Sequence, residues 1–191
     1  MAKPQPKPWT LDEFLAWEQR QTDKFELVGG MVFAMAGGTA AHSRITANVL
    51  TALSAGLRGT GCEAYTSDMK IVADYFSAYP DVSVCCSPVA DEAVTIHDPV
   101  LLVEVLSSST RDRDLRMKFE SYGEIPSLKY YMLIDQERCW VELRSRDEGE
   151  WRSHVCDALD EAIELPALGV TLAVSDIYAR VTVRQRPARP S

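Results

Sequence analysis

The sequence feature that most constrains the fold is the run PVLLVEVL at residues 99–106. A strand with one solvent-exposed face alternates apolar and polar residues, whereas this run is apolar at every position but one. Continuous apolar character of this kind is typical of a central strand that is covered on both faces. The chain must therefore supply two further layers, which favours an α/β sandwich.

The segments before and after this strand supply those layers. Thr10 and Glu13 form a capping box, which predicts a short helix. Gly29-Gly30 suits a primed turn, so residues 25–35 are predicted to form a β-hairpin. The other predicted elements are a helix with apolar residues Ile45, Val49, Leu53 and Leu57, strands at 66–74 and 80–86, a helix through Leu115, Phe119 and Tyr122 that ends by Pro126, a strand at 128–135, and a meander at 138–145, 151–156 and 170–174. Together they predict a mixed central sheet flanked by helices.

The length of 191 residues predicts a single domain, which we place at residues 9–181 with flexible arms at 1–8 and 182–191. No apolar run approaches the ~20 residues needed to cross a bilayer, and the N-terminus lacks the apolar stretch of a secretory signal. We therefore expect no membrane association. The five cysteines include no C-x-x-C pair and leave an odd one over, which argues against a disulfide framework and a structural zinc site. Cys85 and Cys86 are expected to be small buried hydrophobes in a reducing cytoplasmic setting.

The net charge of −8 differs from the basic character of most nucleic-acid-binding proteins. Its distribution is uneven, because residues 147–164 are strongly acidic whereas the last stretch is basic. The basic side chains of that stretch are Arg180, Arg184, Arg186 and Arg189. A local positive patch can coexist with an acidic body, although such runs are more often solvated surface.

Glu104 is the one charged residue in the central strand. A lone carboxylate in a dry strand costs several kcal/mol, roughly, unless a partner or a metal compensates it. Asp81 starts the preceding predicted strand, so the two carboxylates converge if the strands are neighbours. An aspartate at a strand start can also be a simple turn or cap residue.

Lys118 falls on the apolar stripe of the following helix, at i+3 from Leu115 and i−4 from Tyr122. An ammonium there needs an anion, and Glu104 and Asp81 are the candidates. Two carboxylates and a lysine suit Mg²⁺ or Mn²⁺ bound to a phosphodiester. The backbone carbonyl of Val105 is a possible further ligand. The alternatives for Lys118 are a snorkelling surface lysine and one half of an ion pair with Asp114, four residues earlier.

Several motifs in order resemble the family of bacterial "putative restriction endonuclease" domains, within the PD-(D/E)XK nuclease superfamily. They are YPDV at 79–82, PVLLVEVLS at 99–107, Ser109-Thr110, Asp114, Lys118 and Tyr122, supported by FELVGG at 25–30, HSRI at 42–45, SDMK at 67–70 and LKYYMLI at 128–134. The resemblance runs from about residue 9 to about residue 181. It implies a restriction-endonuclease-like α/β sandwich with a helix and β-hairpin before the sheet and a β-meander after it.

The resemblance also implies a metal-dependent endonuclease that acts on DNA, often as a homodimer. Asp81 matches the Asp of the motif and Glu104 its (D/E). The chain departs from the motif two residues later, where Leu106 replaces the lysine. We expect Lys118 to substitute for it from the helix, with Lys70 as the second choice.

Further site residues are predicted at the margins. Glu26 is a candidate metal ligand or base, or a solvated hairpin residue. His42, at the amino end of its helix, can contact the scissile phosphate or position a water, or be purely structural. Arg111 lies in a basic cluster that can follow a DNA backbone, or be surface charge. Lys70 is otherwise the exposed face of a strand.

Two rival functions remain open at this point. One is a catalytically inactive dimeric protein with the nuclease fold that serves as a binding or scaffold module, which Leu106 and the acidic balance favour. The other is an enzyme that acts on a small phosphorylated molecule.

Overall fold

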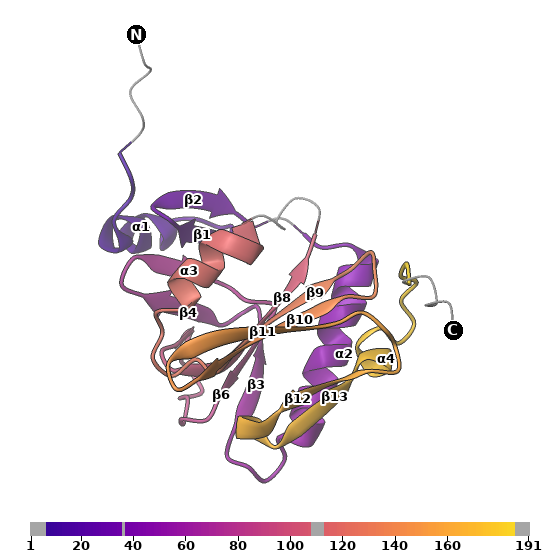
Figure 1. Ribbon diagram of the computed structural model, residues 1–191. Coiled ribbons are helices and arrows are strands. Elements are labelled where there is room, and N and C mark those ends of the chain that lie inside the picture. Colours follow the sequence, from indigo (N-terminus) through magenta and orange to yellow (C-terminus); the bar gives the residue numbers. More distant parts are fainter. Residues whose placement is uncertain (1–6, 36, 108–112, 186–191) are drawn as a thin grey trace.

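The computed structural model describes residues 7–35, 37–107 and 113–185, with the backbone alone at 113–115. A six-stranded mixed sheet in the order β11-β10-β9-β8-β6-β3 forms its centre (Figure 1). Its strands are β3 (Glu63–Thr66), β6 (Val82–Cys85), β8 (Pro99–Leu106), β9 (Tyr130–Asp135), β10 (Val141–Asp147) and β11 (Glu150–Cys156). Only the β8–β9 pair is parallel among the described pairs of this sheet. The predicted central strand is confirmed, because β8 has buried residues at seven of eight positions.

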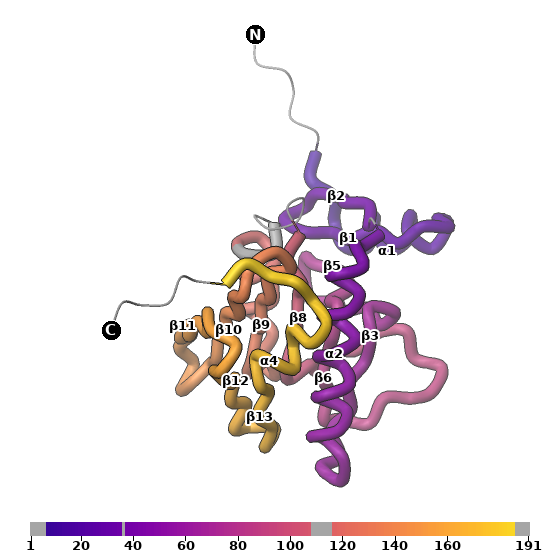
Figure 2. Tube along the Cα trace, turned by 90° about the vertical axis from the view of Figure 1, so that its right-hand side faces the viewer, coloured from indigo at the N-terminus to yellow at the C-terminus, as the bar shows by residue number. Residues whose placement is uncertain are grey.

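One face of this sheet is covered by α2 (Ala40–Gly56), α4 (Val174–Ile177) and the two-stranded sheet β12 (Ala162–Leu165) and β13 (Val170–Ala173). Figure 2 shows α2 running along β6 and β8 on this side. The predicted helical stripe is confirmed: Ile45, Val49 and Leu53 are fully buried, and Leu57 nearly so. They pack against Val82, Val84, Leu101, Val103 and Val105 in one core cluster.

The other face is covered by α3 (Phe119–Tyr122) and by a second sheet in the order β2-β1-β5-β4-β7. Its strands are β1 (Phe25–Val28), β2 (Met31–Ala34), β4 (Lys70–Ala73), β5 (Phe76–Ala78) and β7 (Thr95–Ile96), with α1 (Leu11–Glu18) beside β1. The capping box and the hairpin are both confirmed, with Gly29 and Gly30 at positive φ in the turn. Tyr122, Leu102 and Leu106 lie between the two sheets in a second core cluster.

The structure corrects the prediction of one strand at residues 66–74. Two strands that belong to different sheets replace it, because β3 ends at Thr66 and β4 begins at Lys70. The backbone N–H of Met69 donates to the carbonyl of Thr66 and closes the turn between them. The apolar alternation in residues 66–74 therefore runs across a turn, which the sequence did not reveal.

The cysteines also depart from the prediction, because Cys62 and Cys86 form a disulfide. Glu63 pairs with Cys85 in the β3–β6 register, so the next pair outward brings these two cysteines face to face. The expectation for Cys85 is confirmed, since it is buried and unbonded. The disulfide contradicts the expectation that Cys86 is only a small hydrophobe.

Residues 182–185, which the sequence places in a terminal arm, lie beside the β9–β10 turn. The backbone of Arg184 donates to the carbonyl of Glu137 and accepts from the N–H of Cys139. In the residues that the structure describes, no helix is long and apolar enough to span a membrane.

Candidate active site

Glu104 points from β8 into the layer between the two sheets. It shares a face with Leu102 and Leu106, both of which belong to the core cluster beneath α3. The side chain of Glu104 is only 6% exposed. A buried carboxylate is stable only when polar partners replace its hydration.

Lys118 supplies one of these partners. It ends a π-helical segment, Arg113–Lys118, that leads directly into α3. Its Nζ lies 2.9 Å from Glu104 Oε1 and 2.9 Å from Glu26 Oε1, and its side chain is 3% exposed. The reading of Lys118 as a snorkelling surface lysine is therefore wrong. Single π-helical turns often occur at functional sites, where they redirect a side chain.

Tyr122 is a site residue that the sequence placed on the apolar stripe and among the family motifs, without a role at the site. Its hydroxyl donates to Glu104 Oε1 over 3.0 Å. Burial, and then the negative charge of Glu104, hold the pKa of Tyr122 well above its ordinary value, so the phenol stays protonated and remains a donor. Its spacing of four residues from Lys118 was the available signal, because such residues share a helix face.

Glu26 brings the second sheet into the site. It is buried in β1, and its Oε1 accepts from Lys118 and, over 3.2 Å, from the backbone N–H of Tyr79. The reading of Glu26 as a solvated hairpin residue is therefore wrong. The carboxylate lies where it can orient the ammonium that contacts Glu104.

Asp81 lies directly before β6, at the edge where that strand begins. Val82 pairs with Val103, so Asp81 and Glu104 form the next pair in the antiparallel register. Asp81 Oδ2 accepts from the backbone N–H of Val105 over 2.7 Å and lies 3.3 Å from His42 Nε2. The structure thus joins Asp81 with His42 and the backbone of Val105 beside the Glu104 group.

His42 reaches Asp81 from the amino end of α2. Thr39 is the N-cap residue of this helix, and its hydroxyl accepts from the backbone N–H of His42. The amino end of a helix favours anions through its N–H groups and its dipole. The position of His42 therefore suits an anionic ligand near Asp81.

Other predicted residues lie elsewhere. Lys70 forms an ion pair with the buried Glu18 and lies 5.5 Å from the centre of the Tyr79 ring. This contact directs Lys70 to Glu18, and its roles as the second-choice lysine and as a substrate-binding residue stay predictions. Leu106, at the usual lysine position, is buried in apolar surroundings. Arg111 lies outside the described residues.

The donor set at this site consists of carboxylate oxygens, which suit a hard cation such as Mg²⁺ or Mn²⁺. Among the residues that the structure describes, no group of three or more His, Cys, Asp or Glu side chains could hold a metal ion. Magnesium usually takes only one or two carboxylates from a protein and completes its shell with water and substrate phosphate. Asp81 and Glu104 fit this smaller requirement.

Similarity to known proteins identifies the family of this chain. Residues 11–175 match the Uma2 family, which is described as "Putative restriction endonuclease". The chain belongs to this family. Two relatives from Synechocystis sp. are similar to it, and both are named as uncharacterized proteins. One is slr1290, 38% identical over 172 residues that cover 87% of this chain and 90% of the relative. The other is sll1609, 35% identical over 134 residues that cover 66% and 75%.

A solved structure of a "putative nuclease belonging to DUF820" from Anabaena variabilis resembles this Uma2 protein with a TM-score of 0.76. The match covers 90% of this chain and 98% of that one at 19% identity. This likeness confirms the restriction-endonuclease-like fold. The description of the family supports a nuclease.

Proposed function

We propose that this Uma2 protein is a metal-dependent endonuclease that hydrolyses DNA phosphodiester bonds. The observation that carries the proposal is the position of Lys118, whose Nζ lies 2.9 Å from Glu104, the acidic residue of the motif. The lysine of the motif, which this chain lacks on β8, is thus supplied by the following helix.

The proposed metal is Mg²⁺ or Mn²⁺, held by the side chains of Asp81 and Glu104 and by the backbone carbonyl of Val105. A bound divalent cation lowers the pKa of its water and polarises the phosphoryl group. Val105 also donates its N–H to Asp81, which fixes the orientation of that carboxylate. Glu26 either contributes a further ligand or orients Lys118.

The remaining side chains contact the substrate or orient the proposed metal ligands. Lys118 stabilises the negative charge that develops on the phosphate in the transition state. Tyr122 holds Glu104 in place through its hydroxyl. His42, beside Asp81, contacts the scissile phosphate or positions the attacking water.

The test is plasmid nicking by purified protein with Mg²⁺ and with Mn²⁺. We expect cleavage by the wild type, and a rate of nicking that is at least about a hundredfold lower for Glu104→Gln. Glu164→Gln is the matched control, because Glu164 is exposed on β12 and outside the site. Absence of cleavage by the folded wild type, or equal cleavage by Glu104→Gln, would contradict the proposal.

The rival functions give different outcomes in the same experiments. A catalytically inactive scaffold would bind no Mg²⁺ in calorimetry and would not nick DNA. An enzyme for small phosphorylated molecules would be inhibited by nucleotides in competition with DNA. The homodimer and the cytoplasmic location remain predictions, and sedimentation velocity tests the first.

A further inference from the structure

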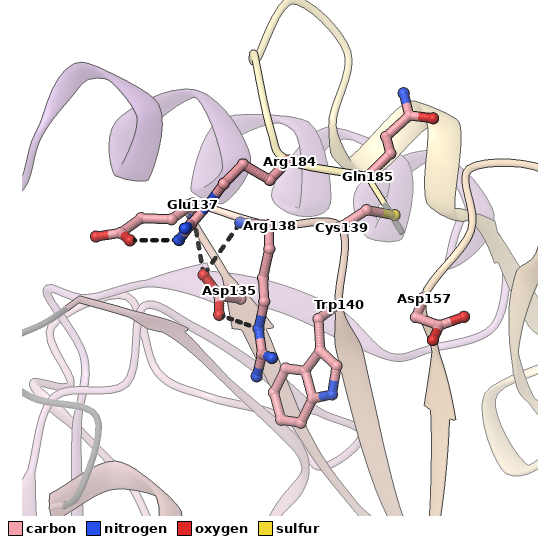
Figure 3. A pocket seen from close by; sticks show the side chains of 8 residues that line it. All are labelled: Asp135, Glu137, Arg138, Cys139, Trp140, Asp157, Arg184 and Gln185. Carbon is pink, nitrogen blue, oxygen red and sulfur yellow. Dashed lines mark hydrogen bonds and ion pairs between the residues drawn. The ribbon is translucent and has the colours of Figure 1, made fainter. Parts of the chain in front are cut away.

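An open groove of about 680 Å³ lies where β9 turns into β10 (Figure 3). The residues that line it include Asp135, Glu137, Arg138, Trp140, Asp157 and Arg184. None of these residues belongs to the proposed catalytic centre. Arg138 has a defined orientation within this groove.

Arg138 is held in place by two neighbours. Its Nε donates over 2.8 Å to Asp135, whose side chain is 1% exposed. The guanidinium carbon lies 5.2 Å from the centre of the Trp140 ring, within the range of a cation–π contact. Figure 3 shows Nε of Arg138 bonded to Asp135 and the indole of Trp140 beside the guanidinium.

The two terminal nitrogens of Arg138 have no hydrogen-bond partner within the described part of the chain. The side chain is still 48% exposed. A guanidinium whose terminal nitrogens are open to a ligand offers the geometry that binds a phosphate through two parallel hydrogen bonds. Because Asp135 and Trp140 already restrict its rotation, less entropy is lost when a phosphate binds.

The groove lies on the same side and at the same end of the sheet as Glu104. Glu104 pairs with Leu133 on the parallel strand β9, and Asp135 follows two residues later. Neighbouring strands lie about 4.8 Å apart and rise about 3.3 Å per residue, so the two Cα atoms are roughly 8 Å apart. Trp140 packs against the same core cluster as Tyr122, which places it on the face that carries Glu104.

We propose that Arg138 binds a phosphate of the DNA strand a few nucleotides from the scissile bond. Successive phosphates of one strand recur about every 3.4 Å along the helix axis, so one strand can reach both places. Arg184 contributes less, because it is paired with Glu137. Since two arginines and three acids line the groove within the described residues, the expected contact is one oriented pair of hydrogen bonds rather than a broad basic surface.

This inference rests on the proposed function, and its test measures DNA binding without cleavage. A fluorescein-labelled duplex is titrated with protein in Ca²⁺ at several salt concentrations. We expect Arg138→Gln to weaken binding roughly tenfold and to reduce the slope of log K against log salt by about one. Arg152→Gln removes the same charge from an exposed position on β11 and is expected to change neither quantity.

Two further measurements make the result specific. Arg138→Lys keeps a cation for Asp135 but lacks the two terminal guanidinium nitrogens. It should therefore fold as the wild type does and bind DNA several-fold more weakly. Duplexes with one neutral methylphosphonate are then tested position by position. At one position, neutralisation should remove the difference between the wild type and Arg138→Gln.

The outcomes separate this inference from the proposed function. If the wild type nicks plasmid while Arg138→Gln and Arg152→Gln bind DNA equally well, only the Arg138 contact is refuted. If the wild type binds no DNA, the proposed function and the contact both fail. Additive effects at every methylphosphonate position also overturn the contact.

Discussion

Lys118 reaches Glu104 from a helix, whereas in the nuclease motif the lysine follows the acidic residue on the same strand. The strand position is occupied by Leu106, whose side chain is 1% exposed in the core. A lysine at that point would place an ammonium among apolar side chains. The helix position instead places the ammonium between two carboxylates, where burial is tolerated.

The first prediction concerns the loss of this ammonium. Lys118→Met leaves two buried carboxylates, Glu26 and Glu104, without a cation that they share, so we expect unfolding free energy to fall by about 3–5 kcal/mol. Urea unfolding measures the change. The double variant Lys118→Met/Glu104→Gln should lose less than the sum of the single changes, and strict additivity would contradict the pairing.

The second prediction concerns the hydroxyl of Tyr122. Tyr122→Phe keeps the ring packing but removes the bond to Glu104, so plasmid nicking should slow roughly tenfold. Tyr130→Phe is the matched control, because its hydroxyl accepts from the backbone of Ala167 instead. If Tyr122 acts only on stability, both variants will nick plasmid at the wild-type rate at low temperature.

Among the elements, β3 and β6 are the pair whose covalent link the sequence did not predict. Cys62 and Cys86 are 24 residues apart and meet only because of the antiparallel register. In denaturant without reductant, we expect a thiol reagent to detect the three free cysteines, and all five after reduction. Cys62→Ser should lower stability by about 3 kcal/mol, as closure of a loop of this length implies. Detection of five thiols before reduction would refute the disulfide.

Much of the fold follows from local patterns. The capping box at Thr10, the Gly29-Gly30 turn and the apolar run at 99–106 each predicted an element that the structure contains. The break after Thr66 and the short strands β5 and β7 were missed. Strands of two to four residues give too little periodicity to be recognised, and their pairing depends on distant partners.

The candidate site was predictable only in part. Glu104 and Asp81 were predicted as site residues because a charge in a central strand needs an explanation and because both match a motif, and the β6–β8 register sets them opposite each other. The contact of Glu26 with Lys118 joins residues 92 positions apart, so no local pattern could predict it. Nor could the sequence reveal the oriented guanidinium of Arg138, which depends on the turn that follows β9.

The molecule as a whole carries several buried or partly buried phenols, and these contribute to its behaviour in alkali. Burial raises the pKa of Tyr65 to about 12, and burial first raises the pKa of Tyr79, Tyr122 and Tyr178 as well. Between about pH 10 and these higher values, the unfolded chain releases protons that the folded protein keeps. These phenols should therefore leave stability unchanged below about pH 10 and lower it above that value.

This effect gives a prediction for one variant. Tyr122→Phe removes one such phenol, so its unfolding free energy should decline with pH more gently than that of the wild type. The difference is one proton, or about 1.4 kcal/mol per pH unit. Urea titrations at pH 9 to 11.5 measure both slopes, and identical slopes would contradict the burial of Tyr122.

Glu26 belongs to the five-stranded sheet, whereas Glu104 belongs to the six-stranded one, and Lys118 spans the gap between them. The proposed centre is thus complete only while the two layers are docked. Partial separation of the five-stranded sheet from the six-stranded sheet would therefore abolish the proposed activity before the six-stranded sheet unfolds. Loss of activity on mild heating should accordingly precede the loss of bulk structure, and a fragment that begins at α2 would keep Asp81 and Glu104 yet lose the contact of Lys118 with Glu26.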